Sequence, residues 1–475
     1  MTKKKILLIE PDYKNSFPPL GLMKIATAHR LQGDDVVFFK GNNPALRDQK
    51  WDAVYITTLF TFEWNKTIKT INFYAKSQST ILVGGILATL MPDKVEKATG
   101  IKPIIGPYKG DVSAILKAIS THSILSPLYN SVKEYGIDAL PPDYGIFENC
   151  NVPYKDMLDT CYIFRSTQGC NRRCDFCSVN IIHPKFIEKI ALEPIVSYID
   201  NNWGMKQNLV LLDDNILQSS SFDSIIDEIS GLGFHRGARF NRCLRSVDFN
   251  QGIDLRLLTC ERIQKLATIA LKPLRLAFDS IDLAEEYEQK IDWAVTAGFK
   301  EISSYILFNY KDTPDDFYDR LHLVCKLNQK KGCRIYSFPM KYVPVSDIDR
   351  TFLGEHWSRR QIRGVQCILN GSHGIVPTKL DYFYRAFGTS ATEFKEIVQM
   401  PEPYIINRYQ DNETIQKSIE HWKMKFSQMS ETQNIASTEL ISGGKGKVIF
   451  SCEDKLILNF LSHYMIELGV NSEIN

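Results

Sequence analysis

The sequence lacks a hydrophobic run long enough to cross a lipid bilayer. Its longest apolar stretch, Ile81 to Met91, is interrupted by two glycines, whereas a membrane-spanning helix needs about 20 apolar residues. A secretory signal is also missing, because the apolar run after the basic N-terminus is broken at Glu10 and Pro11. We therefore expect a cytoplasmic protein without a membrane segment.

The chain also has little net charge. It contains 57 Lys and Arg against 55 Asp and Glu, which gives a formal net charge of +2 and no general attraction to polyanions. A local exception is the basic segment from His235 to Arg245. A solvated loop is the plain interpretation of this segment, and contact with phosphates is the alternative. The sequence therefore leaves nucleic acid open as a partner.

Repeats and low-complexity tracts are absent as well, and what is present is an ordinary globular composition. Hydrophobic residues make up 44% of the chain and charged residues 24%, as in most soluble domains. A length of 475 residues exceeds what a single core supports, so we expect two domains and a smaller appendage.

Three of the 11 cysteines stand close together. Cys170, Cys174 and Cys177 have the spacing Cys-x-x-x-Cys-x-x-Cys, after the apolar stretch 162–164. Thiolates this close repel one another unless a cation or a disulfide draws them together, and a disulfide leaves one of the three over. The spacing therefore favours a bound metal.

The kind of metal follows from what the motif lacks. A structural zinc site needs a fourth Cys or His at short spacing, but the nearest histidine, His183, lies six residues after Cys177 and precedes Pro184. Three thiolates without a fourth ligand suit a 4Fe-4S cluster in which one iron stays open. A broken zinc knuckle, or three unrelated core thiols, is the alternative.

With Phe176 before its last cysteine, the motif resembles that of the radical S-adenosylmethionine (radical SAM) superfamily. The resemblance implies that the three cysteines hold a 4Fe-4S cluster and that S-adenosylmethionine binds its open iron, with Phe176 beside the cofactor. One-electron reduction would then give methionine and a 5'-deoxyadenosyl radical that abstracts hydrogen from the substrate. An electron donor such as flavodoxin or ferredoxin is also implied.

The order of sequence patterns predicts an α/β fold. Residues 1–122 alternate strand and helix patterns, as a doubly wound Rossmann-like domain requires, and residues 123–160 resemble a linker. The strands expected in the first domain are Lys5–Ile9, Asp35–Phe39, Ala53–Thr58, Thr80–Val83 and Pro103–Ile105.

Six strand-helix units follow in residues 161–345, which predicts a parallel sheet. Their strands are expected at Tyr162–Arg165, Leu209–Leu212, Val247–Asn250, Leu274–Phe278, Glu301–Phe308 and Ile335–Tyr342. By resemblance to the radical SAM core, these units would form a partial (β/α)6 barrel. Residues 346–475 predict a mostly helical extension and tail, with a polar linker at 429–437 and a helix from Lys455 to Leu468.

The first domain resembles the cobalamin-binding domain that precedes many radical SAM barrels. Small residues let a flat ring approach the backbone, so the resemblance implies cobalamin contacts at Thr58, Gly84 and Gly85, and with them methylation of an unactivated carbon. The chain lacks the Asp-x-His-x-x-Gly signature of some cobalamin folds. A domain that keeps only the fold is the alternative, and it leaves a cobalamin-independent rearrangement or oxidation.

Polar side chains follow several predicted strands of the barrel, where reactive groups are expected. The resemblance implies that S-adenosylmethionine is held by Asp213, Asp214 and Asn309, and Asp279 could contact its ribose. Gln251, Asp254 and Arg256 are candidates for the ribose hydroxyls, the methionine carboxylate or the substrate. The acidic pair would bind the methionine ammonium and Asn309 the adenine. The plainer alternatives are a helix dipole partner at Asp213, a cap after Asp279 and a turn at Asn309.

The sequence does not name the substrate, which could be a small molecule or a nucleotide. A rival from another class is a non-enzymatic metalloprotein, in which the thiols hold a structural metal and the domains bind a partner.

Overall fold

The structure is a computed structural model that describes residues 3–148, 150–443 and 453–465. The chain divides into two compact units, which are described separately. The first comprises Met1–Leu276, Thr296–Phe299 and Pro344–Thr351, and the second comprises Ala277–Val295, Lys300–Val343 and Phe352–Asn475. The four predicted domain ranges stay predictions.

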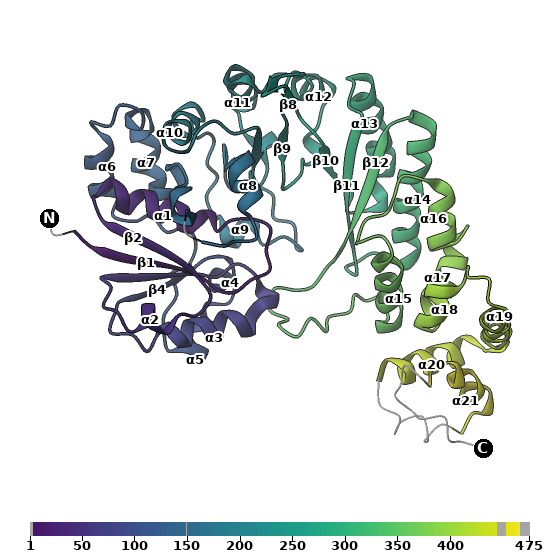
Figure 1. Ribbon diagram of the computed structural model, residues 1–475. Helices are drawn as coiled ribbons and strands as arrows, with labels where there is room; N and C mark the ends of the chain where they lie inside the picture. Colours follow the sequence, from purple (N-terminus) through teal and green to yellow (C-terminus); the bar gives the residue numbers. More distant parts are fainter. Residues whose placement is uncertain (1–2, 149, 444–452, 466–475) are drawn as a thin grey trace. The chain divides into compact units, whose positions relative to one another are not determined.

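The first unit begins with a parallel sheet of order β2-β1-β3-β4. Its strands are β1 (Lys5–Glu10), β2 (Asp35–Lys40), β3 (Ala53–Thr57) and β4 (Ile81–Gly84). Helix α1 (Leu20–Leu31) covers one face of the sheet, and α3 (Trp64–Tyr74) and α5 (Pro92–Thr99) cover the other (Figure 1). Ile9, Val54 and Val95 are buried between these layers.

The predicted fifth strand, Pro103–Ile105, is wrong. The Ile104 N–H bonds to the Val83 carbonyl oxygen at 2.8 Å, but Pro103 has no N–H to extend a ladder. The predicted linker is also more ordered than expected, since it contains α7 (Tyr129–Tyr135) and α8 (Lys155–Thr160).

A second parallel sheet of the first unit has the order β5-β6-β9. It consists of β5 (Cys161–Phe164), β6 (Asn208–Leu211) and β9 (Val247–Phe249), with α10 (Glu193–Trp203) and α11 (Phe222–Ile229) as the helices between them. The basic segment forms the hairpin β7 (Arg239–Phe240) and β8 (Cys243–Leu244). The carboxyl ends of β5, β6 and β9 carry the cysteine motif and the predicted acidic residues.

The other three predicted strands form a sheet of order β10-β11-β12. They are β10 (Leu274–Ala277), β11 (Glu301–Phe308) and β12 (Arg334–Lys341), with α13 (Ala284–Thr296) and α14 (Pro314–Lys331) between them. Thr313 caps α14 in a reciprocal capping box with Asp316. The predicted α/β class with parallel sheets is confirmed.

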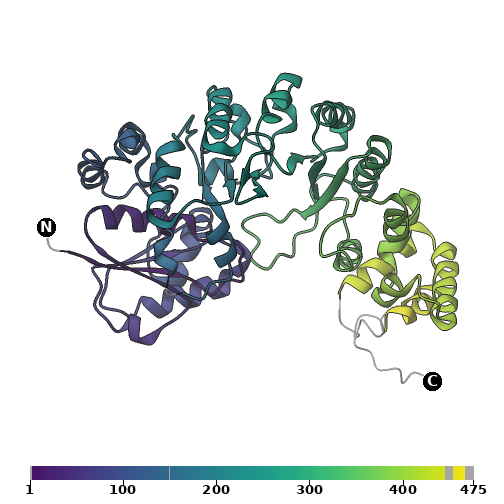
Figure 2. The same ribbon diagram turned by 45° about the horizontal axis from the view of Figure 1, so that its top comes forward.

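Helices make up the remainder of the second unit (Figure 2). They are α15 (Arg359–Asn370), α16 (Leu380–Phe387), α17 (Ala391–Gln399), α18 (Glu402–Asn407), α19 (Glu413–Gln428), α20 (Glu431–Gly443) and α21 (Lys455–Leu461). Helix α21 begins where predicted, and residues 466–468 of the predicted helix lie outside the described residues. No helix in the described part of the chain is both long and apolar enough to span a membrane.

The predicted polar linker at 429–437 is wrong, because α20 occupies most of it. The Ser430 N–H donates to Gln433 Oε1 at 2.9 Å, and the Gln433 N–H donates to Ser430 Oγ at 3.3 Å. This pair is a capping box, which starts a helix even in a polar sequence.

Candidate functional site

The three cysteines lie on a loop that leaves β5 and returns beside its own start. Gln168 and Ile187 form an antiparallel bridge, with N–H to O distances of 3.3 and 2.8 Å. Between them, Gly169 has φ +88°, and a Cβ there would lie 2.7 Å from the Lys185 carbonyl oxygen. A side chain at position 169 would therefore force the two ends of the loop apart.

The three thiols of the loop are close enough to affect one another's ionisation. Burial raises the pKa of Cys177, and Cys174 and Cys170 raise it further. A single metal ion needs its ligands in one coordination shell, and no three His, Cys, Asp or Glu side chains of the described residues are gathered for one ion. A 4Fe-4S cluster distributes three thiolates over three irons, and the 4Fe-4S cluster on this loop stays a prediction.

His183 has a partner at each ring nitrogen. Its Nδ1 lies 2.7 Å from Asp214 Oδ2, and its Nε2 lies 2.8 Å from Arg165 Nη1. Because a guanidinium only donates hydrogen bonds, Nε2 accepts and Nδ1 carries the proton that is donated to Asp214. Neither nitrogen remains for a metal, which counts against His183 as the fourth ligand of a zinc site.

Asp214 joins the two ends of the cysteine loop. The oxygen that accepts from His183 also accepts the Gly169 N–H at 2.8 Å. Burial raises the pKa of Asp214, but the hydrogen bond from His183 and the charge of Arg165 outweigh burial and hold this pKa below its usual value. Asp214 is therefore an anion that serves the loop itself.

Asp213 is buried, with 2% of its surface exposed. Its Oδ1 accepts hydrogen bonds from Ser166 N–H at 3.1 Å, Ser166 Oγ at 2.6 Å and Thr167 Oγ1 at 2.7 Å, and also from the Thr167 N–H. Burial raises the pKa of Asp213 against the effect of these bonds. Its Oδ2 has no hydrogen-bond partner, and an unsatisfied buried acceptor costs about 1 to 3 kcal/mol.

Two more buried polar atoms near this strand end lack a partner, Asn215 Oδ1 and Arg165 Nε. The Asn215 amide donates to Cys170 Sγ at 3.5 Å and to Asp254 Oδ2 at 3.2 Å, so this residue adjoins the cysteine loop. An α-amino acid group has an ammonium that donates and a carboxylate that accepts. Two acceptors and one donor without partners thus fit the methionine part of S-adenosylmethionine.

A lysine from the helix that covers the first sheet lies near the same residues. Lys24 of α1 is 4% exposed and donates to the Asp138 carbonyl oxygen. Burial lowers the pKa of Lys24 to about 8, while the charges of Asp138 and Asp213 oppose this decrease. Helix α1 therefore places a cation near Asp213.

The end of β9 brings a charged pair to the cysteine loop. Asp254 accepts from Arg256 Nε at 2.8 Å and from Arg172 Nε, on the loop, at 3.0 Å. Burial lowers the pKa of Arg256, but Asp254 and the nearby Cys174 outweigh burial and raise it. Gln251 is exposed, and its amide donates to Asn250 Oδ1 at 3.4 Å.

The remaining predicted cofactor contacts, Asp279 and Asn309, lie in the second unit. Asn309 is fully buried with φ +65°. Its amide donates to the carbonyl oxygens of Tyr342 at 2.9 Å and Phe352 at 3.3 Å, and it accepts the Gly354 N–H at 2.9 Å. These bonds correspond to the turn alternative, and contact of Asp279 or Asn309 with S-adenosylmethionine stays a prediction.

The residues predicted to contact cobalamin interact with other groups of the protein. Thr58 is fully buried; its hydroxyl donates to the Gly84 carbonyl oxygen and accepts the Ala88 N–H, both at 3.0 Å. Gly85 has φ +118°, and a Cβ there would lie 2.5 Å from the Thr58 carbonyl oxygen. The helix that follows, α4 (Ile86–Leu90), contacts α9 (Val179–Ile182) after the cysteines. Thr58 and Gly85 thus hold the turn after β4 together, and contact of Thr58, Gly84 or Gly85 with cobalamin stays a prediction.

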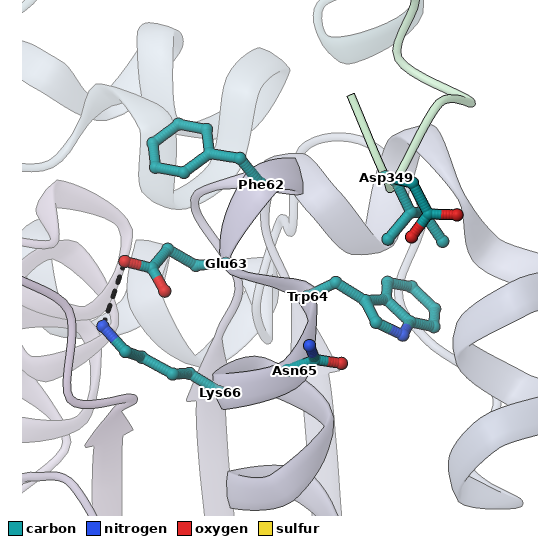
Figure 3. A pocket seen from close by; sticks show the side chains of 7 residues that line it. Phe62, Glu63, Trp64, Asn65, Lys66 and Asp349 are labelled. Carbon is teal, nitrogen blue, oxygen red and sulfur yellow. Dashed lines mark hydrogen bonds and ion pairs between the residues drawn. The ribbon is translucent and has the colours of Figure 1, made fainter. Parts of the chain in front are cut away.

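A cavity of about 530 Å³ lies instead beside the start of α3 (Figure 3). It is lined by Phe62, Glu63, Trp64, Asn65, Lys66, Ile348 and Asp349. Glu63 and Lys66 form an ion pair at 3.0 Å across its edge (Figure 3). None of its lining side chains has a buried polar atom without a partner, so the cavity lacks the ligand signal found near Asp213.

The chain was compared with known proteins and solved structures. No protein-family model and no curated protein matches the chain. The structure is similar to the radical S-adenosylmethionine methyltransferase TsrM from Kitasatospora setae, solved with its tryptophan substrate and a SAM analog, with a TM-score of 0.49 and 14% identity over 72% of this chain and 73% of that chain.

A second similar structure is coproporphyrinogen III oxidase (HemN) from Escherichia coli, a radical SAM enzyme. Its TM-score is 0.32, with 15% identity over 45% of this chain and 53% of that chain. Both of these similar proteins are radical SAM enzymes.

The sequence patterns did not identify His183 as a partner of Asp214, and they did not identify Arg165, Asn215 or Lys24. Asn215 directly follows the predicted acidic pair, and Lys24 stands among buried residues of α1. A charged residue on the apolar face of a helix is a usable signal, since lysine is rarely buried without partners. For Arg165 and His183 the sequence carries no comparable signal.

Proposed function

We propose that the chain is a radical SAM enzyme. The observation that carries the proposal is the set of three partnerless buried atoms, Asp213 Oδ2, Asn215 Oδ1 and Arg165 Nε, at strand ends that adjoin a loop with three thiols. When bound, a 4Fe-4S cluster would supply an electron and an open iron for cleaving S-adenosylmethionine to methionine and a 5'-deoxyadenosyl radical.

Each residue of the site has a separate task in this proposal. Cys170, Cys174 and Cys177 would hold the cluster. Asp213 and Asn215 would accept hydrogen bonds from the ammonium of S-adenosylmethionine, and Arg165 would donate one to its carboxylate.

The charged pair at β9 has an electrostatic task. Asp254 orients Arg172 and Arg256, and Arg256 is near Cys174. Positive charge beside a thiolate favours the deprotonated sulfur that iron requires. These arginines would therefore help the loop to take up iron and would offset the charge of the loaded site.

The Thr58 hydroxyl is paired within the protein, and the Gly85 backbone packs against Thr58. This packing favours a cobalamin-independent reaction. A rearrangement or an oxidation of a small molecule or a nucleotide is therefore preferred over cobalamin-dependent methylation. An electron donor such as flavodoxin or ferredoxin would supply the reducing electron in the cytoplasm.

Iron content and cofactor cleavage test the proposal together. Anaerobic reconstitution should give about four irons per chain, and dithionite with S-adenosylmethionine should then release 5'-deoxyadenosine. Cys174→Ala should abolish both, because the cluster loses a ligand. Cys243→Ala is the matched control, since Cys243 is an exposed thiol outside the loop. Stoichiometric zinc with no iron uptake would instead support the non-enzymatic metalloprotein.

A further inference from the structure

We propose that His183 is a positioning residue that closes the cysteine loop through Asp214 and thereby determines how firmly the loop retains iron. The inference deepens the proposed function and rests on it, because it concerns retention of the proposed cluster. The ring nitrogens of His183 are hydrogen-bonded to Asp214 and Arg165. Its effect would therefore be transmitted through these two residues.

One carboxylate oxygen holds both ends of the loop. Asp214 Oδ2 accepts from Gly169, directly before Cys170, at 2.8 Å, and from His183, after Cys177, at 2.7 Å. The side chains of His183 and Asp214 are 11% and 8% exposed. Hydrogen bonds to a charged acceptor are stronger than neutral ones, and burial strengthens them further.

The close approach at Gly169 shows that little room separates the two ends. A Cβ at Gly169 would lie 2.7 Å from the Lys185 carbonyl oxygen and 3.2 Å from Phe186 Cα. The loop is thus a closed ring of chain whose ends meet at Gly169, Asp214 and His183. Without the His183 donor, the returning end loses its bond to Asp214, and the loop would open more often to water and to chelators.

Two substitutions separate the contacts of His183. Asn places its amide nitrogen near the position of Nδ1, so His183→Asn can still donate to Asp214. Gln places its amide oxygen near the position of Nε2, so His183→Gln can accept from Arg165 but loses the donor to Asp214. His183→Ala removes both contacts. His322→Ala is the control, because His322 is a half-buried histidine of the second unit that bonds to Tyr384.

The measurement is the anaerobic rate of iron release to a chelator from reconstituted full-length protein, with the electron paramagnetic resonance spectrum of the reduced cluster recorded in parallel. His183→Gln and His183→Ala should release iron about tenfold faster, as loss of one charge-assisted bond implies. His183→Asn and His322→Ala should match the unchanged protein in rate and spectrum.

The outcomes separate this inference from the proposed function. Equal release rates in all four variants, or fast release from His183→Asn with slow release from His183→Gln, would overturn the role through Asp214. Failure of the unchanged protein to take up iron would overturn the proposed function and this role with it. Slow iron release from His183→Asn, with fast release from His183→Gln and His183→Ala, would support the inference. A general loss of packing would affect the Asn and Gln variants alike.

Discussion

Two sets of strand ends in the first unit look alike in sequence and differ in how their polar groups are satisfied. At β1 and β3, buried Glu10 accepts from Asn15 at 2.9 Å and Tyr154 at 2.7 Å, and Thr58 is fully paired. At β5 and β6, Arg165, Asp213 and Asn215 each keep a buried atom without a partner.

The contrast favours the second set in the proposal for the ligand site. Unsatisfied buried groups destabilise a fold, and a ligand that pairs with them removes this cost. The paired side chains of Glu10 and Thr58 at the first sheet stabilise the protein through their hydrogen bonds. Small or polar residues at a strand end are thus an ambiguous signal until their partners are known.

The largest effect that would sharpen this contrast is expected at Asp213. Asp213→Asn keeps the acceptor that holds Ser166 and Thr167 but replaces the partnerless oxygen with a donor and removes the charge. The affinity for S-adenosylmethionine should fall about ten- to a hundredfold, since a charge-assisted bond contributes about 1.5 to 3 kcal/mol. Equilibrium binding to cluster-loaded protein measures this change.

Thr58→Val is the matched control from the first sheet. It removes a buried hydroxyl with two partners, so it should lower stability and leave the affinity for S-adenosylmethionine unchanged. Equal losses of affinity in Thr58→Val and Asp213→Asn would erase the distinction between the two sets of strand ends.

A smaller effect, on stability, is expected at Gly85. Gly85→Ala should lower the free energy of unfolding by about 1 to 3 kcal/mol, because its Cβ would meet the Thr58 carbonyl oxygen in a strained backbone conformation. Gly84→Ala should change it less, since a Cβ there makes an ordinary contact of 3.6 Å with Ile104. Urea denaturation of both variants measures the difference.

Cobalamin binding near Gly85 can be tested directly. Protein purified with hydroxocobalamin and desalted should retain no corrin absorbance, because the Thr58 and Gly85 groups fill the expected contact. Stoichiometric retention would contradict this interpretation and restore the methyltransferase version of the function.

The smallest effect concerns the pH dependence of stability. Burial lowers the pKa of Lys24 to about 8 from its ordinary value of 10.5, so the unfolded chain binds more protons between these values. This group therefore makes stability rise with pH in that window, by at most about 1.4 kcal/mol per pH unit. Lys24→Met should remove this contribution, which urea denaturation at pH 8, 9 and 10 would show as a smaller slope. Identical slopes for Lys24→Met and the unchanged protein would contradict the lowered pKa of Lys24.

Much of the fold could be predicted because its signals are local. Alternating patterns located the strands of all three larger sheets, and Thr313 marked the start of α14. Errors arose where a local signal was misread. Pro103 excluded the fifth strand for lack of an N–H, and the Ser430 and Gln433 capping box was overlooked in a polar segment.

The cysteine spacing, the α/β class and the positions of polar residues at strand ends follow from the order of residues along the chain. The partners of those residues do not. Asp214 lies 45 residues from Gly169 and 31 from His183, and Thr58 lies 30 residues from Ala88. A carboxylate or hydroxyl accepts whichever donor packing places within reach, and that donor comes from a distant segment. Residue order therefore located the polar groups, whereas the packing of β5, β6 and α4 determined which of them remain unsatisfied and can bind a ligand.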